Sequence, residues 1–267
     1  MSKLDLIIQR TRARVAVAKA ATSVRALEKL AAEHTPRGFK SAVEGRAATE
    51  PAIIAELKKA SPSKGIIREN LQVVPLAREL AEAGATCLSV LTEPEFFHGS
   101  LGNLELASSA TFRPCLRKDF MVDEFQIVEA RAHRADAILL IVAALSDTEL
   151  RQMYKAAKSA GLDVLCEVHD GEELQRALDC GCSDMIGVNN RNLHDFDVSL
   201  ETSLKLINDI PESTVRVAES GIRDGEDIAR LRAAGFQGFL IGETLMRAEH
   251  PGQALRTLIE SARGVHV

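Results

Sequence analysis

Aromatic residues are scarce in this sequence of 267 residues, and it has no excess of positive charge. Trp is absent, Tyr occurs once, and aromatic residues make up 4% of the chain, so stacking platforms for single-stranded nucleic acid are not expected. Acidic residues outnumber basic ones by 38 to 33, and the resulting net charge of −5 argues against general binding to a polyanion. We therefore expect no nucleic-acid partner.

Cysteine pairs that could hold zinc are also missing. The five cysteines are an odd number and include no Cys-x-x-Cys pair. Cys87, Cys115 and Cys166 lie in apolar runs, where buried free thiols are common. Cys180 and Cys182 flank a glycine and have too few neighbouring ligands for a zinc site. These observations predict a reduced, cytoplasmic protein.

Long hydrophobic runs are absent as well. No apolar run approaches the length of a membrane span. The N-terminal segment lacks the uninterrupted apolar core and cleavage site of a signal peptide, and Asp5 weighs against an Arg-rich transit peptide. We expect no membrane partner.

The first part of the chain is predicted to be helical. Residues 2–34 carry apolar side chains at helical spacing, Pro36-Arg37-Gly38 ends this pattern, and residues 39–50 are expected to form a loop with at most a short helix. We therefore divide the chain into a helical N-terminal extension, residues 1–50, and a following part, residues 51–267. All 267 residues are expected to form one domain.

From residue 52 onward, short apolar runs alternate with polar loops and amphipathic helical patterns. Several helices begin with a capping signature, such as Ser146-Asp147-Thr148-Glu149, and several are followed by a glycine. Eight strands alternating with eight helices predict an α/β fold. The apolar runs are 52–57, 86–91, 114–120, 137–143, 163–168, 184–189, 214–220 and 238–243, and the helical patterns lie at about 71–83, 101–110, 123–133, 146–160, 171–180, 199–208, 224–234 and 251–263.

Two architectures fit this alternation. An open doubly wound sheet usually carries a glycine-rich phosphate turn after its first strand. The first turn here, KKASPSKG, contains neither Gly-x-Gly-x-x-Gly nor Gly-x-x-x-x-Gly-Lys. The count of eight favours a closed (β/α)8, or TIM, barrel.

Ionisable and amide side chains gather at the ends of six of the eight predicted strands. In a (β/α)8 barrel these ends form the active-site face, so the clustering predicts a catalytic rim. In the first strand, Glu56 and Lys58 are two residues apart and project to the same side. One such pair alone would fit a surface ion pair, but the arrangement recurs along the chain. The residues at the strand ends are Glu56, Lys58, Arg117, Lys118, Asp119, Glu167, Asn189, Asn190, Arg191, Glu219, Ser220 and Glu243.

The residue types on this rim restrict the chemistry. Lysines and glutamates can move protons, and Arg191 and Asn189 can anchor an anion. No His stands at a strand end, and His169 and His194, each before an Asp in a loop, are expected at the surface. The sequence offers no Ser or Cys with a neighbouring His that would suggest acyl transfer. The rim predicts proton transfer on an anionic substrate without a metal or an organic cofactor.

The last two predicted loops suggest a phosphate site. Ser220-Gly221-Ile222-Arg223 is a turn of small residues, and the segment from Gly242 to Arg247 can begin a short extra helix. Backbone N–H groups at these two places form the phosphate site that is common in this fold. Glu243 has the wrong sign for a phosphate, so we expect its side chain to point elsewhere, toward Lys58.

Across essentially its whole length the chain resembles the indole-3-glycerol-phosphate synthases, barrel enzymes of tryptophan biosynthesis. The resemblance rests on eight segments in the right order, and their joint occurrence is very specific. Arg134, where the family usually has Gly, and Cys166, where an aliphatic residue is more usual, depart from the pattern. The segments are IIAELKKASPSKG (53–65), LSVLTEPEFFHGS (88–100), LRKDFMVDEFQI (116–127), ADAILLIVAAL (135–145), CEVHD (166–170), IGVNNRNL (186–193), VAESGI (217–222) and FLIGETLM (239–246).

The resemblance implies conversion of 1-(2-carboxyphenylamino)-1-deoxyribulose 5-phosphate to indole-3-glycerol phosphate, with loss of CO2 and water. Lys118 matches the family's general acid for ring closure. Glu167 and Glu56 match carboxylates with base or supporting roles, and Lys58 matches a lysine that contacts the substrate and is a second candidate acid. The length predicts a monofunctional enzyme, either a monomer or a weak homodimer.

The remaining implied residues bind the substrate. Asn189 and Glu219 match positioning residues that we include among the catalytic candidates. The other expected substrate contacts are Ser61, Arg191, Ser220, Phe97, Phe120 and Leu139, of which the last three would line an apolar pocket for the anthranilate ring. The expected phosphate contacts are Lys58, Gly221, Gly242 and Glu243.

Three alternatives remain open. A Schiff-base lysine barrel would use Lys118 or Lys58 covalently, and a phosphoribosylanthranilate isomerase would need no decarboxylation. A catalytically silent barrel would be expected to lose rim residues. If Lys118 is the acid, we expect burial or neighbouring cations, Lys58 and Arg117, to lower its pKa.

Overall fold

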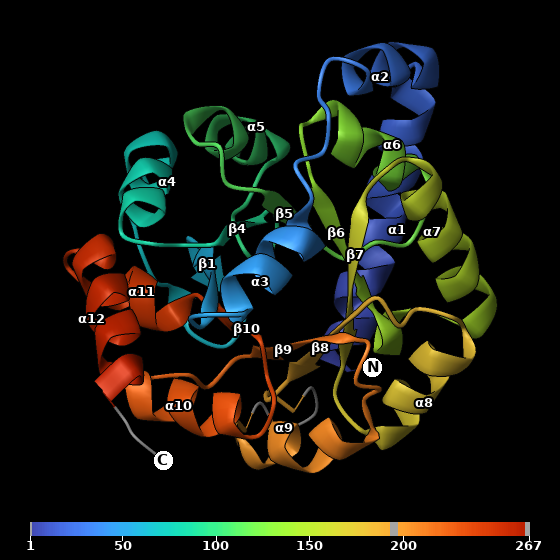
Figure 1. Ribbon diagram of the computed structural model, residues 1–267. Coiled ribbons are helices and arrows are strands. Elements are labelled where there is room, and N and C mark those ends of the chain that lie inside the picture. Colours follow the sequence, from blue (N-terminus) through green and yellow to red (C-terminus); the bar gives the residue numbers. More distant parts are fainter. Residues whose placement is uncertain (1, 193–196, 265–267) are drawn as a thin grey trace.

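The computed structural model describes residues 2–192 and 197–264. Eight parallel strands form a closed barrel in the order β1-β10-β9-β8-β7-β6-β5-β4, and β1 pairs with β4 to complete it. Figure 1 shows the strands at the centre and the helices around them. The prediction of a (β/α)8 barrel is therefore confirmed. The strands are β1 (Ala52–Leu57), β4 (Cys87–Leu91), β5 (Cys115–Lys118), β6 (Ala137–Ile141), β7 (Asp163–Val168), β8 (Met185–Asn189), β9 (Val215–Glu219) and β10 (Gly238–Ile241).

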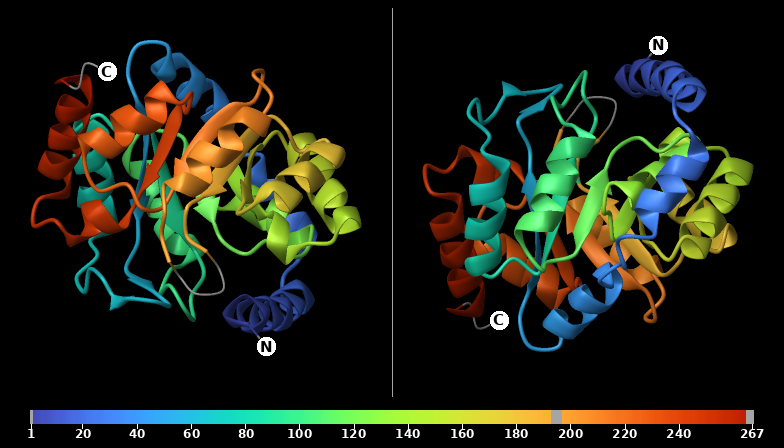
Figure 2. Two further views of the ribbon diagram at one scale, coloured as in Figure 1. Left: turned by 90° about the horizontal axis from the view of Figure 1, so that it is seen from below. Right: turned by 90° about the horizontal axis from the view of Figure 1, so that it is seen from above.

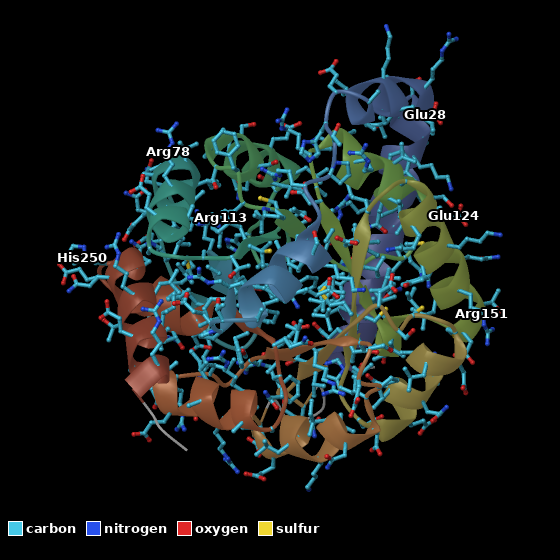
Figure 3. The ribbon with its side chains drawn as sticks, viewed as in Figure 1. Glu28, Arg78, Arg113, Glu124, Arg151 and His250 are labelled. Carbon is cyan, nitrogen blue, oxygen red and sulfur yellow. The ribbon has the colours of Figure 1, made fainter. Side chains whose placement is uncertain are left out.

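The outer helices follow the predicted strand–helix alternation. Ser146 and Glu149 form the expected capping box at the start of α7. The outer helices are α4 (Val73–Glu82), α5 (Leu101–Ala110), α6 (Phe125–Ala132), α7 (Asp147–Ser159), α8 (Gly171–Asp179), α9 (Glu201–Leu206), α10 (Gly225–Ala233) and α12 (Pro251–Gly264), with the short α11 (Glu243–Arg247) and the 3-10 turns η1 (Val142–Ala144) and η2 (Ile207–Asp209) between them. Charged side chains such as Glu28, Arg78 and Arg151 extend outward from the helices (Figure 3).

Two apolar layers hold the barrel together. One large cluster fills the space between strands and outer helices and includes Leu80, Leu104 and Leu150, all fully buried. A smaller cluster fills the barrel interior and includes Ile54 and Leu139. This division follows from the alternation of side chains along each strand, because successive residues face opposite sides of the barrel wall.

The N-terminal extension is helical, as predicted, but it is broken into α1 (Lys3–Ala21), α2 (Val24–Ala31) and α3 (Phe39–Ala47). Residues 39–50, expected to be mainly a loop, are mainly the nine-residue helix α3. The break between the first two falls at Ser23, whose side chain accepts a hydrogen bond from the Ala26 N–H and caps α2. Figure 2 shows α1 and α3 at opposite ends of the barrel. Phe39 and Val43 of α3 are fully buried against the interior cluster, so α3 closes one end.

A buried carboxylate joins the extension to the barrel. Asp136, fully buried before β6, accepts hydrogen bonds from the Arg37 guanidinium (2.5 Å from Nη2), the Arg37 N–H (2.7 Å) and the Cys115 N–H (2.6 Å). His34 Nε2 lies 3.1 Å from the same carboxylate. These bonds satisfy a charge that would otherwise be costly to bury.

Residues 60–66 were predicted to form a loop. They form instead a small antiparallel hairpin of β2 (Ala60–Ser61) and β3 (Gly65–Ile66). Gly65 takes a positive φ of 64°, which permits the tight reversal. Within residues 2–192 and 197–264, no helix has the length and apolarity needed to cross a membrane.

Candidate active site

A pocket lies at the carboxyl ends of the barrel strands, where the sequence predicted a catalytic rim. It is lined by every candidate catalytic and substrate-binding residue and by Glu243; Gly221 and Gly242 are not among the lining residues. The N-terminal helix contributes Lys3, Leu4 and Ile7, which were not predicted. Lys3 Nζ also donates a hydrogen bond to the Pro62 carbonyl (2.7 Å), so α1 contacts the loop after β1.

Lys118 occupies the centre of the polar part of this pocket. Its Nζ lies 2.8 Å from Glu167 Oε2 and 2.6 Å from Glu219 Oε2, although the three residues come from β5, β7 and β9. Burial alone would lower the pKa of Lys118, but Glu167, Glu219 and, more distantly, Glu56 outweigh it and raise the pKa above its ordinary value. The side chain is therefore held as an ammonium ion.

This finding contradicts the expected lowering of the Lys118 pKa. Arg117, which we expected to act as a neighbouring cation, faces the opposite side of the strand. Its guanidinium is buried among Asp119 (3.0 Å), Glu129 (2.9 Å) and the Gln126 carbonyl (2.9 Å). Lys58 is bound instead to Glu56. The carboxylates around Lys118 therefore decide the direction of its shift.

The two glutamates beside Lys118 differ in their pKa values. For Glu167, the cations Lys118 and His169 outweigh the effect of burial and hold the pKa below its usual range. For Glu219, burial and the nearby Glu167 carboxylate outweigh Lys118 and raise the pKa to about 7. Adjacent acids with opposite shifts can divide base and acid roles at neutral pH.

A second lysine–glutamate pair completes the site. Lys58 Nζ lies 2.7 Å from Glu56 Oε1, and the Ser89 hydroxyl donates to Glu56 Oε2 (3.2 Å). Burial acts to raise the pKa of Glu56, but Lys58 and then Lys118 outweigh it and lower the pKa. Glu56 is therefore an ionised carboxylate that interacts with both lysines.

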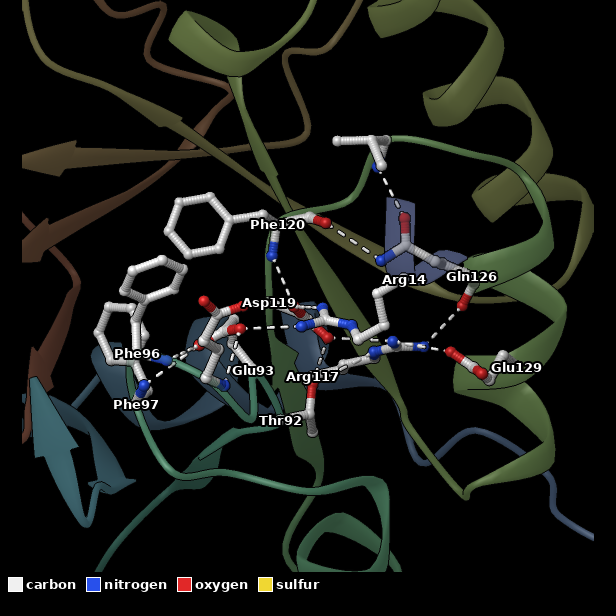
Figure 4. Close-up of polar contacts among 12 residues, drawn as sticks. Arg14, Thr92, Glu93, Phe96, Phe97, Arg117, Asp119, Phe120, Gln126 and Glu129 are labelled. Atoms are coloured by element: carbon white, nitrogen blue, oxygen red, sulfur yellow. Dashed lines mark hydrogen bonds and ion pairs between the residues drawn. The ribbon is translucent and has the colours of Figure 1, made fainter. Parts of the chain in front are cut away.

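Phe97 and Phe120 form the apolar wall, with ring centroids 6.1 Å apart and planes inclined by 43°. Figure 4 shows that a polar network lies behind this wall. Glu93, after β4, accepts hydrogen bonds from the N–H groups of Phe96 (2.7 Å) and Phe97 (3.1 Å), and Arg14 of α1 donates to it (2.8 Å). The N-terminal extension therefore supports a loop of the pocket through the partly buried contact of Arg14 with Glu93.

The residues around the expected phosphate site have a definite geometry. Gly221 has a φ of 82°, and Gly242 is the N-cap of α11, the short extra helix that was predicted. Glu243 lines the pocket, and its carboxylate pairs with Arg247 (3.0 Å) and Arg191 (3.7 Å). The expected direction toward Lys58 is wrong, because Glu56 binds Lys58 and two guanidinium groups attract Glu243.

His169 was expected at the surface, and this expectation is wrong. Its side chain is only 8% exposed and lies between the carboxylates of Glu167 and Glu173. His194, the other loop histidine, lies outside the described residues. In the part of the chain that the structure describes, no group of three or more His, Cys, Asp or Glu side chains could hold a metal ion.

Asn189 and Arg191 lie at the end of β8, between the strands that carry Glu167 and Glu219. The Asn189 side-chain oxygen accepts a hydrogen bond from the Arg191 N–H (3.1 Å), which fixes the chain as it leaves β8. Ser220 follows β9 with a φ of 63°, and its carbonyl accepts a hydrogen bond from the Asn190 amide (3.1 Å). The bond between Asn190 and Ser220 ties the ends of β8 and β9 together.

Comparisons with known proteins identify the family of this chain. The family described as indole-3-glycerol phosphate synthase matches residues 4–258. The protein named indole-3-glycerol phosphate synthase from Koribacter versatilis (strain Ellin345) is 58% identical over 258 residues, which cover 97% of this chain and 99% of that protein. Two solved structures share only the fold. The structure of 3-hexulose-6-phosphate synthase from Salmonella typhimurium is 12% identical with a TM-score of 0.64, and the match covers 80% of this chain and 100% of that one. The structure of KGPDC from Streptococcus mutans is 13% identical with a TM-score of 0.61, and the match covers 81% of this chain and 99% of that one. The chain belongs to the indole-3-glycerol phosphate synthase family.

Proposed function

We propose that this protein is a carbon–carbon lyase of the carboxy-lyase class. It converts 1-(2-carboxyphenylamino)-1-deoxyribulose 5-phosphate to indole-3-glycerol phosphate, CO2 and water. The family membership gives the reaction, and one observation carries its assignment to this site: the pocket holds an ammonium group, Lys118, bound by two buried carboxylates.

Lys118 is the proposed acid for ring closure. As the aromatic carbon attacks the C2 carbonyl, negative charge develops on the carbonyl oxygen and must be neutralised. The raised pKa of Lys118, caused by neighbouring carboxylates that outweigh its burial, keeps a proton on Nζ. An alkoxide is far more basic than an amine, so proton transfer to it is favourable.

The second half of the reaction restores aromaticity. Loss of CO2 regenerates the benzene ring, and dehydration then removes a proton and expels a hydroxyl group. Glu167, an ionised carboxylate with a lowered pKa, is the proposed base, and Glu56 supports it. Lys58, bound to Glu56 at 2.7 Å, is the proposed acid for the leaving hydroxyl.

The remaining pocket residues would bind the two ends of the substrate. Phe97, Phe120 and Leu139 would contact the anthranilate ring, while Ser61, Asn189, Arg191, Glu219 and Ser220 would orient the sugar chain. Backbone N–H groups at Gly221 and Gly242, together with Lys58, would bind the phosphate. The pairing of Glu243 with Arg247 and Arg191 supports this assignment, because it offsets the negative charge of Glu243.

The test is an indole fluorescence assay with the carboxyphenylamino-deoxyribulose phosphate, run with a chelator present. We expect turnover by the wild type, loss of at least about 1000-fold in Lys118→Ala, and full activity in Lys155→Ala, which changes an exposed lysine of α7. Absence of turnover by folded wild-type protein would refute the proposed reaction.

The same samples separate the alternative activities. An isomerase would release no CO2, so trapping of labelled CO2 would exclude isomerase activity as the explanation. A Schiff-base enzyme would be inactivated by borohydride with substrate, but it needs a neutral amine as nucleophile. The carboxylates around Lys118 favour the protonated form and so oppose that role.

A further inference from the structure

His169 lies where the pocket meets the outer layer of the barrel. It directly follows β7, which carries Glu167, and precedes α8. Its side chain is 8% exposed, and its two ring nitrogens face different carboxylates. Nε2 lies 3.4 Å from Glu167 Oε1, and Nδ1 lies 2.9 Å from Glu173 Oε2.

Glu173 is itself held firmly. Its side chain also accepts a hydrogen bond from the backbone N–H of His169 (2.8 Å). Its own backbone N–H donates to the Asp170 side chain (2.9 Å), which caps the N-terminus of α8. The first turn of α8 therefore fixes the carboxylate that holds the imidazole ring.

The two oxygens of Glu167 have separate cationic neighbours. Oε1 faces His169, whereas Oε2 accepts a hydrogen bond from Lys118 Nζ (2.8 Å). A partial rotation of the carboxylate about its last bond would lengthen these contacts. The histidine and the lysine thus lie against different oxygens of the same carboxylate.

We propose that His169 is a positioning residue: held by Glu173, its imidazolium ring keeps the Glu167 carboxylate ionised and oriented toward Lys118. This inference rests on the proposed function, because it assigns His169 to the same reaction. His169 does not line the pocket, so it acts through Glu167 and is not a catalytic residue.

The charges around His169 set the direction of the expected pH effect. Burial would lower the pKa of His169, but Glu167 of β7 and Glu173 of α8 raise it to about 10. Lys118 binds the other oxygen of Glu167, and Glu219 in turn binds Lys118. His169 is therefore a cation at neutral pH, and loss of its charge would raise the pKa of Glu167.

The first test is the kcat–pH profile of Glu173→Gln, with Glu172→Gln as the matched control. Glu172 is exposed in the same turn of α8, so both variants remove one charge there. We expect Glu173→Gln to lower kcat roughly 10-fold, with KM within about 2-fold, and to move the acid limb upward by about one pH unit. Glu172→Gln should keep the wild-type profile. If Glu173→Gln keeps both the kcat and the acid limb of the wild type, the proposal is overturned.

Two substitutions of His169 separate its contacts. His169→Gln can keep an N–H donor near the position of Nε2, facing Glu167, whereas His169→Asn can keep only the donor toward Glu173. We expect His169→Gln to retain several-fold more kcat than His169→Asn, at similar KM. The reverse order would contradict the proposed role. If either variant unfolds, Glu173→Gln still decides the question.

A readout independent of turnover distinguishes this inference from the proposed function. NMR of protein labelled at its seven histidines, with His169→Gln used for assignment, should show a protonated His169 ring from pH 6 to 8.5. In Glu173→Gln the ring should titrate at lower pH. A neutral wild-type ring at pH 7 would overturn the proposal. Inactive wild type with a protonated ring would refute only the proposed reaction.

Discussion

The carboxylate of Glu219 lies over Gly187, in space that a side chain at that strand position would fill. A Cβ added to Gly187 would overlap Glu219 Oε1 and would press on Leu165. A similar relationship joins Gly242 to Glu56, because a Cβ at Gly242 would meet the Glu56 carboxylate. A glycine in β8 and a glycine just after β10 thus make room for two of the buried acids in the site.

We predict that Gly187→Ala impairs the reaction by displacing Glu219. The added methyl group should cost about 1–3 kcal/mol of folding free energy, and kcat should fall at least about 10-fold, because the contact between Glu219 and Lys118 at 2.6 Å is lost or lengthened. Urea denaturation and the indole fluorescence assay measure the two effects. Gly45→Ala is the control, since no atom lies within 4 Å of a Cβ there; equal losses in both variants would disprove the steric account.

Glu219→Gln is predicted to make the protein more stable and less active. Burial and Glu167 raise the pKa of Glu219 to about 7, so the folded protein holds a proton that the unfolded chain releases near pH 4.5. The stability contributed by this carboxyl group is therefore present at low pH and is lost as pH rises through 7. Relative to wild type, the glutamine variant should gain about 1–3 kcal/mol between pH 5 and pH 8. Thermal unfolding across that range measures the gain, and a constant difference at all pH values would contradict the prediction.

Arg14→Met is predicted to weaken substrate binding more than chemistry. Arg14 donates to Glu93, which in turn holds the N–H groups of the loop that carries Phe97. Without the guanidinium, Glu93 is a 1%-exposed carboxylate held mainly by backbone donors, so KM should rise several-fold while kcat changes less than about 3-fold. Steady-state kinetics measure both constants.

Arg10→Met is the matched control for this prediction. Arg10 also lies on α1 and pairs with Glu95, but both side chains are more than half exposed and 3.8 Å apart. Such a pair contributes little. A KM increase of the same size in Arg10→Met would assign the effect to general loosening of α1 and not to the contact with Glu93.

The backbone architecture was predictable because each local signal agreed with the fold. Eight apolar runs, the helix caps and the glycines with positive φ after helices, such as Gly84 and Gly235, all fit one barrel. The rim residues were predictable for a geometric reason: parallel strands bring their carboxyl ends to one face. The hairpin at residues 60–66 was missed because a two-residue strand leaves no periodic pattern.

The pairing of charges across the rim was less predictable. Contacts between β5, β7 and β9 depend on the size and closure of the barrel, so the sequence could not indicate that Glu167 and Glu219 would both bind Lys118. The error for Arg117 was avoidable, since adjacent strand residues face opposite sides. His169 was misplaced because a polar residue before a helix cap is usually exposed. The spacing of Asp170 and Glu173 is typical of a capping box, and it was the signal that the Glu173 side chain folds back toward His169.

The departure at Arg134 leads to the last prediction. Arg134 follows α6 with a φ of 66°, a left-handed conformation that strains any residue with a Cβ. Its carbonyl accepts a hydrogen bond from the Ser108 hydroxyl (3.0 Å), so the surrounding structure holds the backbone in place. Arg134→Gly removes the strain but adds flexibility to the unfolded chain, and the two effects leave an expected gain of about 0.5–1 kcal/mol.

Arg134→Ala separates backbone strain from loss of the long side chain. Alanine keeps the Cβ and the strained φ, so this variant should gain no stability, whereas Arg134→Gly should raise the Tm by about 1–4 °C. Differential scanning calorimetry of both variants makes the comparison. The Nε of Arg134 is buried without a hydrogen-bond partner. An equal gain in Tm in the two variants would therefore assign the effect to removal of the guanidinium and not to relief of backbone strain.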